Sequence, residues 1–164
     1  MSKTLENLME AFAGESQAYQ KYSAYAVQAD KEGYKQAAKL FRAAAEAEKI
    51  HAGNHFKAAE KIKSTKENLM DAINGETYEF EKMYPPMIED AKAEGHKAAE
   101  RSFTMANTVE QTHARLYKDA LADLDLAKDE DIYVCPICGE TMVGKAPEKC
   151  PVCGASSKVF MKID

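Results

Sequence analysis

Residues 46–56 read EAEKIHAGNHF, and this stretch places Glu48 and His51 three residues apart. Helix-forming residues surround the pair, so we expect a helix with both side chains on one of its faces. The same face carries Phe41, Ala44 and Ala52, which are apolar or small. A carboxylate and an imidazole on an apolar face need a partner that offsets their loss of water. The rest of the chain indicates what that partner is.

Bulk composition excludes several classes of function. The chain has 164 residues, 45% hydrophobic and 30% charged, as in a globular domain with a small appendage. Its net charge of −5 argues against a nucleic-acid or anionic-membrane partner. No apolar run approaches the roughly 20 residues of a membrane span. The first residues, MSKTLENLME, lack the apolar core of a signal peptide, so we expect a cytoplasmic protein.

The segment 1–126 is expected to form four helices. It is rich in Ala, Glu, Lys, Met and Leu, and its only prolines are Pro85 and Pro86, which should kink or interrupt the third helix. Ser64 and Glu67 form a capping-box pattern that opens this helix. The four expected helices span about 3–30, 34–62, 65–93 and 96–126. Their length predicts an all-α four-helix bundle, with a first domain at 1–128.

The expected second and fourth helices are copies of each other. When the segment 32–52 is aligned with 94–114, nine of the paired positions are identical. The Glu-x-x-His of residues 48–51 recurs within this match at residues 110–113. One such pattern on a helix is common by chance and is usually solvated. Two copies in a visible repeat indicate a duplicated helical hairpin with a shared function.

The other two helices each carry a glutamate at a comparable position. The separation of Glu15 from Glu48 equals that of Glu76 from Glu110 to within one position. All four glutamates, and Glu79 one turn after Glu76, lie on largely apolar helix faces. Burying an ionised carboxylate costs several kcal/mol, and clustering five of them adds repulsion that two histidines do not offset.

A pair of metal cations offsets this cost. Oxygen ligands with one imidazole for each metal suit iron or manganese. One glutamate from each of two helices, with Glu-x-x-His from each of the other two, is the ligand set of di-iron carboxylate bundles. The candidate metal ligands of the bundle are therefore Glu15, Glu48, His51, Glu76, Glu79, Glu110 and His113.

A second, small module is expected at residues 129–164. It contains two Cys-x-x-Cys pairs, CPIC at 135–138 and CPVC at 150–153, which the segment 139–149 separates, and a glycine follows each pair. This spacing predicts a tetrahedral four-thiolate metal site. The sulfur ligands alone fit zinc as well as iron, whereas a di-iron neighbour favours iron. The candidate ligands are Cys135, Cys138, Cys150 and Cys153.

With both modules described, the chain resembles the rubrerythrin family over essentially its whole length. The resemblance includes the carboxylate and histidine pattern, the segment ETYEFEKMYP at 76–85 and the paired CPIC and CPVC motifs. It implies a ferritin-like di-iron four-helix bundle followed by a rubredoxin-like module. The implied activity is a non-haem peroxidase that reduces hydrogen peroxide to water, as a defence against oxidative stress. The implied cofactors are two iron ions in the bundle and one bound by the four cysteines.

The resemblance also implies roles for individual ligands. Glu48 and Glu110 correspond to the carboxylates that bridge the two irons in the family. Glu15 corresponds to a ligand of the first iron, and Glu76 and His113 correspond to ligands of the second iron. No ligand departs from the family pattern.

Four residues match positions that the family uses in the reaction. His51 and Glu79 correspond to a pair of exchanging ligands: the first iron takes Glu79 when oxidised and shifts toward His51 when reduced. Tyr22 and Tyr84 correspond to tyrosines near the site. For these two, ordinary packing of aromatic rings on a helix face is the alternative reading.

The implied partners are hydrogen peroxide and an electron-donor protein, either a rubredoxin or an NAD(P)H-dependent reductase. Because the bundle is long, the cysteine iron is expected to lie far from the di-iron site of its own chain, and a head-to-tail homodimer or higher homo-oligomer would bring donor and acceptor together. Three alternatives stay open. They are a ferritin-like iron-oxidising store, another di-iron oxidase such as a monooxygenase, and a zinc-ribbon interaction protein.

Overall fold

The structure is a computed structural model that describes residues 2–124 and 129–164. These residues form two compact units, one ending at Lys63 and one beginning at Ser64. The predicted domain boundary between residues 128 and 129 falls at the edge of the segment that is not described. Among the described residues, no helix combines the length and apolarity needed to cross a membrane.

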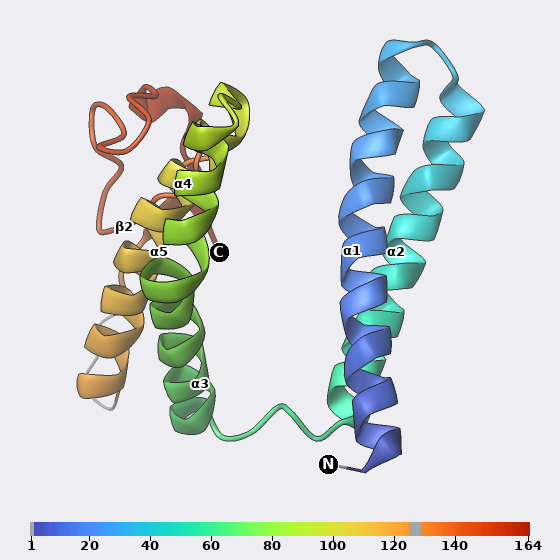
Figure 1. Ribbon diagram of the computed structural model, residues 1–164, viewed down its shortest axis with the longest axis horizontal. Helices are drawn as coiled ribbons and strands as arrows, with labels where there is room; N and C mark the ends of the chain where they lie inside the picture. Colours follow the sequence, from blue (N-terminus) through green and yellow to red (C-terminus); the bar gives the residue numbers. More distant parts are fainter. Residues whose placement is uncertain (1, 125–128) are drawn as a thin grey trace. The chain divides into compact units, whose positions relative to one another are not determined.

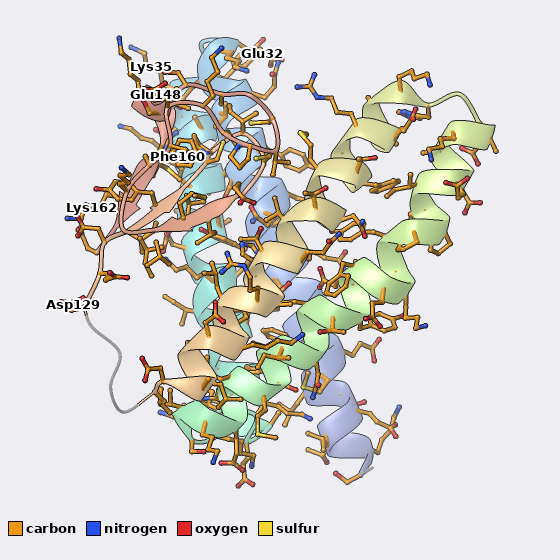
Figure 2. All side chains as sticks on the ribbon, turned by 90° about the vertical axis from the view of Figure 1, so that its left-hand side faces the viewer. Glu32, Lys35, Asp129, Glu148, Phe160 and Lys162 are labelled. Atoms are coloured by element: carbon orange, nitrogen blue, oxygen red, sulfur yellow. The ribbon has the colours of Figure 1, made fainter. Side chains whose placement is uncertain are left out.

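The first unit is a hairpin of two helices, α1 (Lys3–Lys31) and α2 (Lys35–Ala58) (Figure 1). They are joined at Gly33, whose φ of 85° suits glycine, next to Glu32 (labelled in Figure 2). The seam between the helices is built from small buried residues, which let the backbones approach closely: Ala26, Ala29, Ala38, Ala45 and Ala52. Near the ends of the helices that lie away from Gly33, the rings of Phe12 and Phe56 contact each other at a tilt of 34°, with centroids 4.8 Å apart.

Helix α2 is shorter than the sequence predicted. It ends at Ala58 rather than near residue 62. Glu60 adopts a left-handed conformation with φ of 54°, and the N–H of Lys61 donates to the carbonyl of Phe56 at 3.3 Å. A left-handed residue with such a bond is a usual way for a helix to end.

The second unit begins with the helices α3 (Thr65–Tyr78), α4 (Tyr84–Ala93) and α5 (Lys97–Ala122). The predicted capping box is present, since the Ser64 side chain accepts from the Glu67 backbone and the Glu67 carboxylate accepts from the Ser64 backbone. Helices α3 and α4 both pack against α5 (Figure 1). Gly95, with φ of 69°, joins α4 to α5 as Gly33 joins the helices of the first unit.

The predicted interruption of the third helix is a π-helical segment, η1 (Glu79–Met83). The N–H of Tyr84 donates to the carbonyl of Glu79, five residues earlier instead of four. Pro85 and Pro86 follow at the first turn of α4, where a proline's missing N–H is tolerated. The wider turn accommodates one extra residue, and such π-segments are frequent at functional sites.

The rest of the second unit is a three-stranded antiparallel sheet with two cysteine-containing turns. Strands β1 (Ile132–Val134), β2 (Thr141–Val143) and β3 (Met161–Ile163) are arranged in the order β2-β1-β3. Thr141 pairs with Val134 across β2 and β1. Lys162, labelled on the last strand in Figure 2, forms an ion pair of 2.7 Å with Asp131.

Candidate metal centres

Three predicted ligands meet within the first hairpin and form what we call the first half-site. Glu15 comes from α1, and Glu48 and His51 come from neighbouring turns of α2. One ligand atom from each lies within 4.8 Å of the others. The Nδ1 atom of His51 lies 2.9 Å from Oε2 of Glu48. The helical spacing of three residues thus turns both α2 side chains toward the same point, as the sequence predicted.

The second half-site repeats this arrangement in the second unit. Glu76 comes from α3, and Glu110 and His113 come from α5, with their ligand atoms again within 4.8 Å of one another. The Nδ1 atom of His113 lies 2.8 Å from Oε2 of Glu110 and 4.0 Å from Oε1 of Glu76. All three side chains are half-buried, with 15–26% of their surface exposed.

The carboxylates of the second half-site repel one another. Burial raises the pKa of Glu76 above its ordinary value, and the charge of Glu110 raises it further, while His113 opposes both. Burial and the charge of Glu76 likewise raise the pKa of Glu79. Carboxylate oxygens only accept hydrogen bonds, so a group of them around one imidazole lacks donors. A cation of charge two or more supplies what is missing, and the residues present therefore fit a metal ion.

Glu79 lies beside the second half-site without being one of its three close ligands. It begins the π-segment η1, and its electrostatic neighbours are Glu76 and His113. The sequence predicted Glu79 as a ligand, and this position next to the half-site leaves that role a proposal.

The two candidate tyrosines differ in their surroundings. Burial raises the pKa of Tyr84, and the charges of Glu79, Glu110 and Glu76 raise it further, so its hydroxyl lies in the field of the second half-site. Tyr22 packs against Tyr25 and Phe41, with ring centroids 6.2 and 6.4 Å apart. Tyr84 packs in the same way against a phenylalanine, Phe103, at 6.2 Å. Both units of the repeat therefore contain the tyrosine–phenylalanine contact.

The four cysteines converge as the sequence predicted. They are free thiols, with Sγ atoms 3.6 Å apart between Cys135 and Cys153 and 3.5 Å apart between Cys138 and Cys150. A tetrahedron of metal–sulfur bonds of about 2.3 Å has edges of about 3.8 Å, so a metal ion fits the gap. These distances are far too long for disulfide bonds.

Both cysteine turns have the same backbone hydrogen bond. Each glycine after a Cys-x-x-Cys pair donates its N–H to the carbonyl of the first cysteine, Gly139 to Cys135 at 2.8 Å and Gly154 to Cys150 at 2.9 Å. Burial opposes ionisation of Cys135, but hydrogen bonds from backbone N–H groups of residues 137 and 138 lower its pKa below the ordinary value. Backbone donors at sulfur stabilise the thiolate that a metal needs.

The cysteine module forms two side-chain hydrogen bonds with α5, from neighbouring residues on both sides. The Thr112 hydroxyl donates to Oε1 of Glu140 at 3.3 Å, and Nε2 of His113 lies 3.0 Å from the Thr141 hydroxyl oxygen. Figure 1 shows β2 beside α5. The expectation that the module lies far from the metal ligands of its own chain is therefore wrong for the second half-site. Neither Glu140 nor Thr141 was predicted, because neither belongs to a ligand motif.

Glu140 is a buried titratable group in this contact. It is only 5% exposed, and its Oε2 atom has no hydrogen-bond partner among the described residues. Burial raises its pKa, which the hydrogen bond from Thr112 only partly opposes. A carboxyl whose pKa is higher in the folded state than in the unfolded state stabilises the folded protein while it is protonated. This contribution to the free energy of unfolding is fully present below the unfolded-state pKa, near 4.5, and is lost as the pH rises through the folded-state pKa.

We expect a Glu140→Gln variant to gain stability relative to wild type as the pH rises from 5 to 8. The glutamine amide does not ionise, so the variant does not lose stability as the pH rises, whereas the wild type does when its buried carboxyl ionises. The measurement is the free energy of unfolding by urea at several pH values, with the same metal loading in both proteins. A difference between variant and wild type that stayed constant with pH would show that Glu140 is not the titrating group.

Two family profiles match the chain. Residues 6–121 match the family described as Rubrerythrin, and residues 133–161 match the domain described as Rubrerythrin, rubredoxin-like domain. The first match contains both half-sites, and the second contains all four cysteines.

Curated relatives and solved structures agree with these matches. Nigerythrin from Nitratidesulfovibrio vulgaris is 41% identical over 174 residues, which cover 98% of this chain and 86% of the relative. Rubrerythrin-2 from Clostridium acetobutylicum is 36% identical, covering 96% of this chain and 95% of the relative. Structures described as the partially reduced state and the fully reduced, all-ferrous state of nigerythrin each align with a TM-score of 0.61 at 38% identity, covering 99% of this chain and 88% of the other.

Proposed function

The chain belongs to the rubrerythrin family, and from this premise we propose that it is a cytoplasmic non-haem di-iron peroxidase that reduces hydrogen peroxide to water. The predicted fold class is confirmed: a ferritin-like helical bundle domain is followed by a rubredoxin-like module. The predicted cofactors are confirmed as well, namely a di-iron site held by glutamates and histidines and a site of four cysteines.

One observation carries the proposal. A single chain holds two Glu-Glu-His half-sites and a four-thiolate site, and the module with the thiolates contacts a histidine of one half-site. Reducing peroxide to two waters requires two electrons and two protons. Two ferrous ions, when bound, supply the two electrons, and a four-thiolate iron is suited to replacing them one at a time.

The ligands would be divided between the half-sites. Glu15, with Glu48 and His51, would hold one iron, and the second half-site would hold the other. Glu48 and Glu110 would be the bridging carboxylates. Glu79 and His51 would be exchanging ligands, because the more positive oxidised state favours an added carboxylate over a neutral imidazole.

Protons would come from groups beside the second half-site. The raised pKa of Tyr84 keeps its hydroxyl protonated at neutral pH, so Oη–H is a donor. Burial and the charge of Glu76 raise the pKa of Glu79 above its ordinary value, and its carboxyl is the second proposed group for proton transfer. Tyr22 is the proposed counterpart of Tyr84 in the first hairpin. The electron donor would be a rubredoxin or an NAD(P)H-dependent reductase, and the active form a homodimer or higher homo-oligomer.

The test is a single anaerobic oxidation of the fully reduced, iron-loaded chain. With limiting hydrogen peroxide, we expect one peroxide consumed for every two ferrous ions oxidised, the cysteine-bound iron counted with the bundle irons, and no oxygen released. Dioxygen should oxidise the same sample more slowly. Faster reaction with dioxygen would favour an oxidase and contradict the proposal, and uptake of far more than three irons per chain would favour an iron store.

A further inference from the structure

Thr141 lies between the two kinds of metal site and contacts both neighbourhoods. It is the first residue of β2, where its pairing with Val134 holds it in register. Its hydroxyl lies 3.1 Å from the carbonyl oxygen of Gly139, the residue that follows Cys138. The same hydroxyl oxygen lies 3.0 Å from Nε2 of His113. Its two partners are therefore a carbonyl oxygen and an imidazole nitrogen.

The hydroxyl has one hydrogen, and the carbonyl of Gly139 only accepts. The Thr141 hydroxyl therefore donates to Gly139. Because the hydroxyl hydrogen points to Gly139, a lone pair of the hydroxyl oxygen faces His113 and suits an N–H donor at Nε2. When Nδ1 gives its lone pair to a metal, Nε2 keeps the hydrogen of the neutral imidazole and can donate it to Thr141. Nδ1 is the atom that faces Glu110 at 2.8 Å and Glu76 at 4.0 Å.

The other Glu-x-x-His has no such contact within the described residues of its own hairpin. His51 also turns Nδ1 toward a glutamate, Glu48, at 2.9 Å. Within the described part of the chain, however, the structure shows no hydrogen bond to Nε2 of His51. The two histidines occupy equivalent places in the repeat, so the helices alone do not supply the partner at Nε2 of His113.

We propose that Thr141 is a positioning residue that fixes His113 as an Nδ1 ligand of the metal at the second half-site. The inference deepens the proposed function, since it rests on a metal at Glu76, Glu110 and His113. The groups that orient a ligating histidine commonly change metal affinity by about 10–100-fold when removed. The four-cysteine module therefore contributes to the metal affinity of the helical domain as well as holding its own metal.

The test uses the full chain loaded with Zn²⁺, a diamagnetic probe that accepts carboxylate, imidazole and thiolate ligands. Histidine ring nitrogens are labelled with ¹⁵N, and long-range proton–nitrogen correlations identify which nitrogen binds zinc and which carries hydrogen. In wild type we expect His113 to bind through Nδ1 with Nε2 protonated. A Thr141→Val variant keeps the shape but cannot accept the hydrogen bond. We expect it to lose the single tautomer and to bind Zn²⁺ at the second half-site about 10-fold more weakly or worse.

Two further variants complete the test. Thr141→Ser retains the hydroxyl and should show the wild-type tautomer of His113 and the wild-type affinity for Zn²⁺. If Thr141→Val fails to load metal, this serine variant still tests whether the hydroxyl is the group that matters. Thr108→Val is the matched control, because the Thr108 hydroxyl donates to the carbonyl of Thr104 on α5 at 2.9 Å and should leave His113 unchanged. The signals of His51 serve as an internal reference.

The outcomes separate this inference from the proposed function. Zinc bound through Nε2 of His113, or a Thr141→Val variant with wild-type tautomer and affinity, would overturn the role of Thr141 and leave the metal site standing. A wild-type protein that bound no zinc at His113 would overturn both.

Discussion

A Cys138→Ser variant is expected to lose donor-driven peroxide reduction by more than about 100-fold. Serine provides no thiolate at neutral pH, so the set of four sulfur ligands drops to three and the iron of the module is lost or altered. The half-sites keep all of their ligands, and one round of oxidation by peroxide should proceed as in wild type. Steady-state turnover with reduced rubredoxin and a single-turnover experiment with chemically reduced protein measure the two effects separately.

Ile137→Ser is the matched control for this variant. It introduces the same side chain at the neighbouring position, which is 57% exposed, and keeps all four thiolates. Its turnover should stay within a few-fold of wild type. Sustained turnover by Cys138→Ser would mean that electrons reach the bundle by another route.

The second large effect concerns stability. A Glu110→Gln variant is expected to melt at a higher temperature than wild type when the bundle is metal-free, and to gain much less from iron. The charge of Glu110 raises the pKa of both Glu76 and Tyr84, so the amide removes a repulsion that the metal-free protein suffers. The same substitution removes a ligand, so iron no longer stabilises the second half-site fully.

Glu89→Gln is the control for the loss of charge alone. Glu89 forms an ion pair of 2.8 Å with Lys92, and its side chain is 73% exposed. Exposed pairs of this kind contribute little, so this variant should show neither the gain without metal nor the smaller response to iron. A Glu110→Gln variant that behaved like Glu89→Gln would indicate that the half-site carboxylates do not repel one another.

The fold and the ligand groups followed from local patterns in the sequence. The capping box at Ser64 fixed the start of α3, and the glycines of the two connections allowed the positive φ values at Gly33 and Gly95. The duplicated Glu-x-x-His placed each histidine beside its glutamate because helical geometry dictates the spacing. The Cys-x-x-Cys turns were predictable for the same reason, since their geometry is local.

The π-segment left a signal in the sequence that the prediction did not use. The stretch ENLM occurs at residues 6–9 and again at 67–70, and Glu15 and Glu76 keep the same offset between the two copies. Beyond η1 the offset is larger by one position, as for Tyr22 and Tyr84. One extra residue therefore lies between Glu76 and Tyr84, where the helix widens. Helix α1, which lacks the extra residue, is α-helical throughout Lys3–Lys31.

The contact of Thr141 with His113 could not be predicted. The two residues lie far apart in the chain, on a helix and a strand whose docking depends on tertiary packing. Glu140, which binds Thr112 in the same contact, is a charged residue that composition would place at the surface. The half-sites were predictable because helical spacing brings their ligands together. The contact between the cysteine module and α5 depends on tertiary packing, so no local pattern predicts it.

The most direct test of this account is the melting temperature of the full chain with and without iron in the half-sites, with the four-cysteine site loaded in both samples. Ferrous iron at about 1,000 times its Kd stabilises a site by about 4 kcal/mol, which corresponds to roughly 8–16 °C for a protein of this size. We predict that the fully loaded protein melts higher than the protein with empty half-sites by roughly 10 °C or more. Equal melting temperatures would contradict the claim that metal ions neutralise these carboxylates.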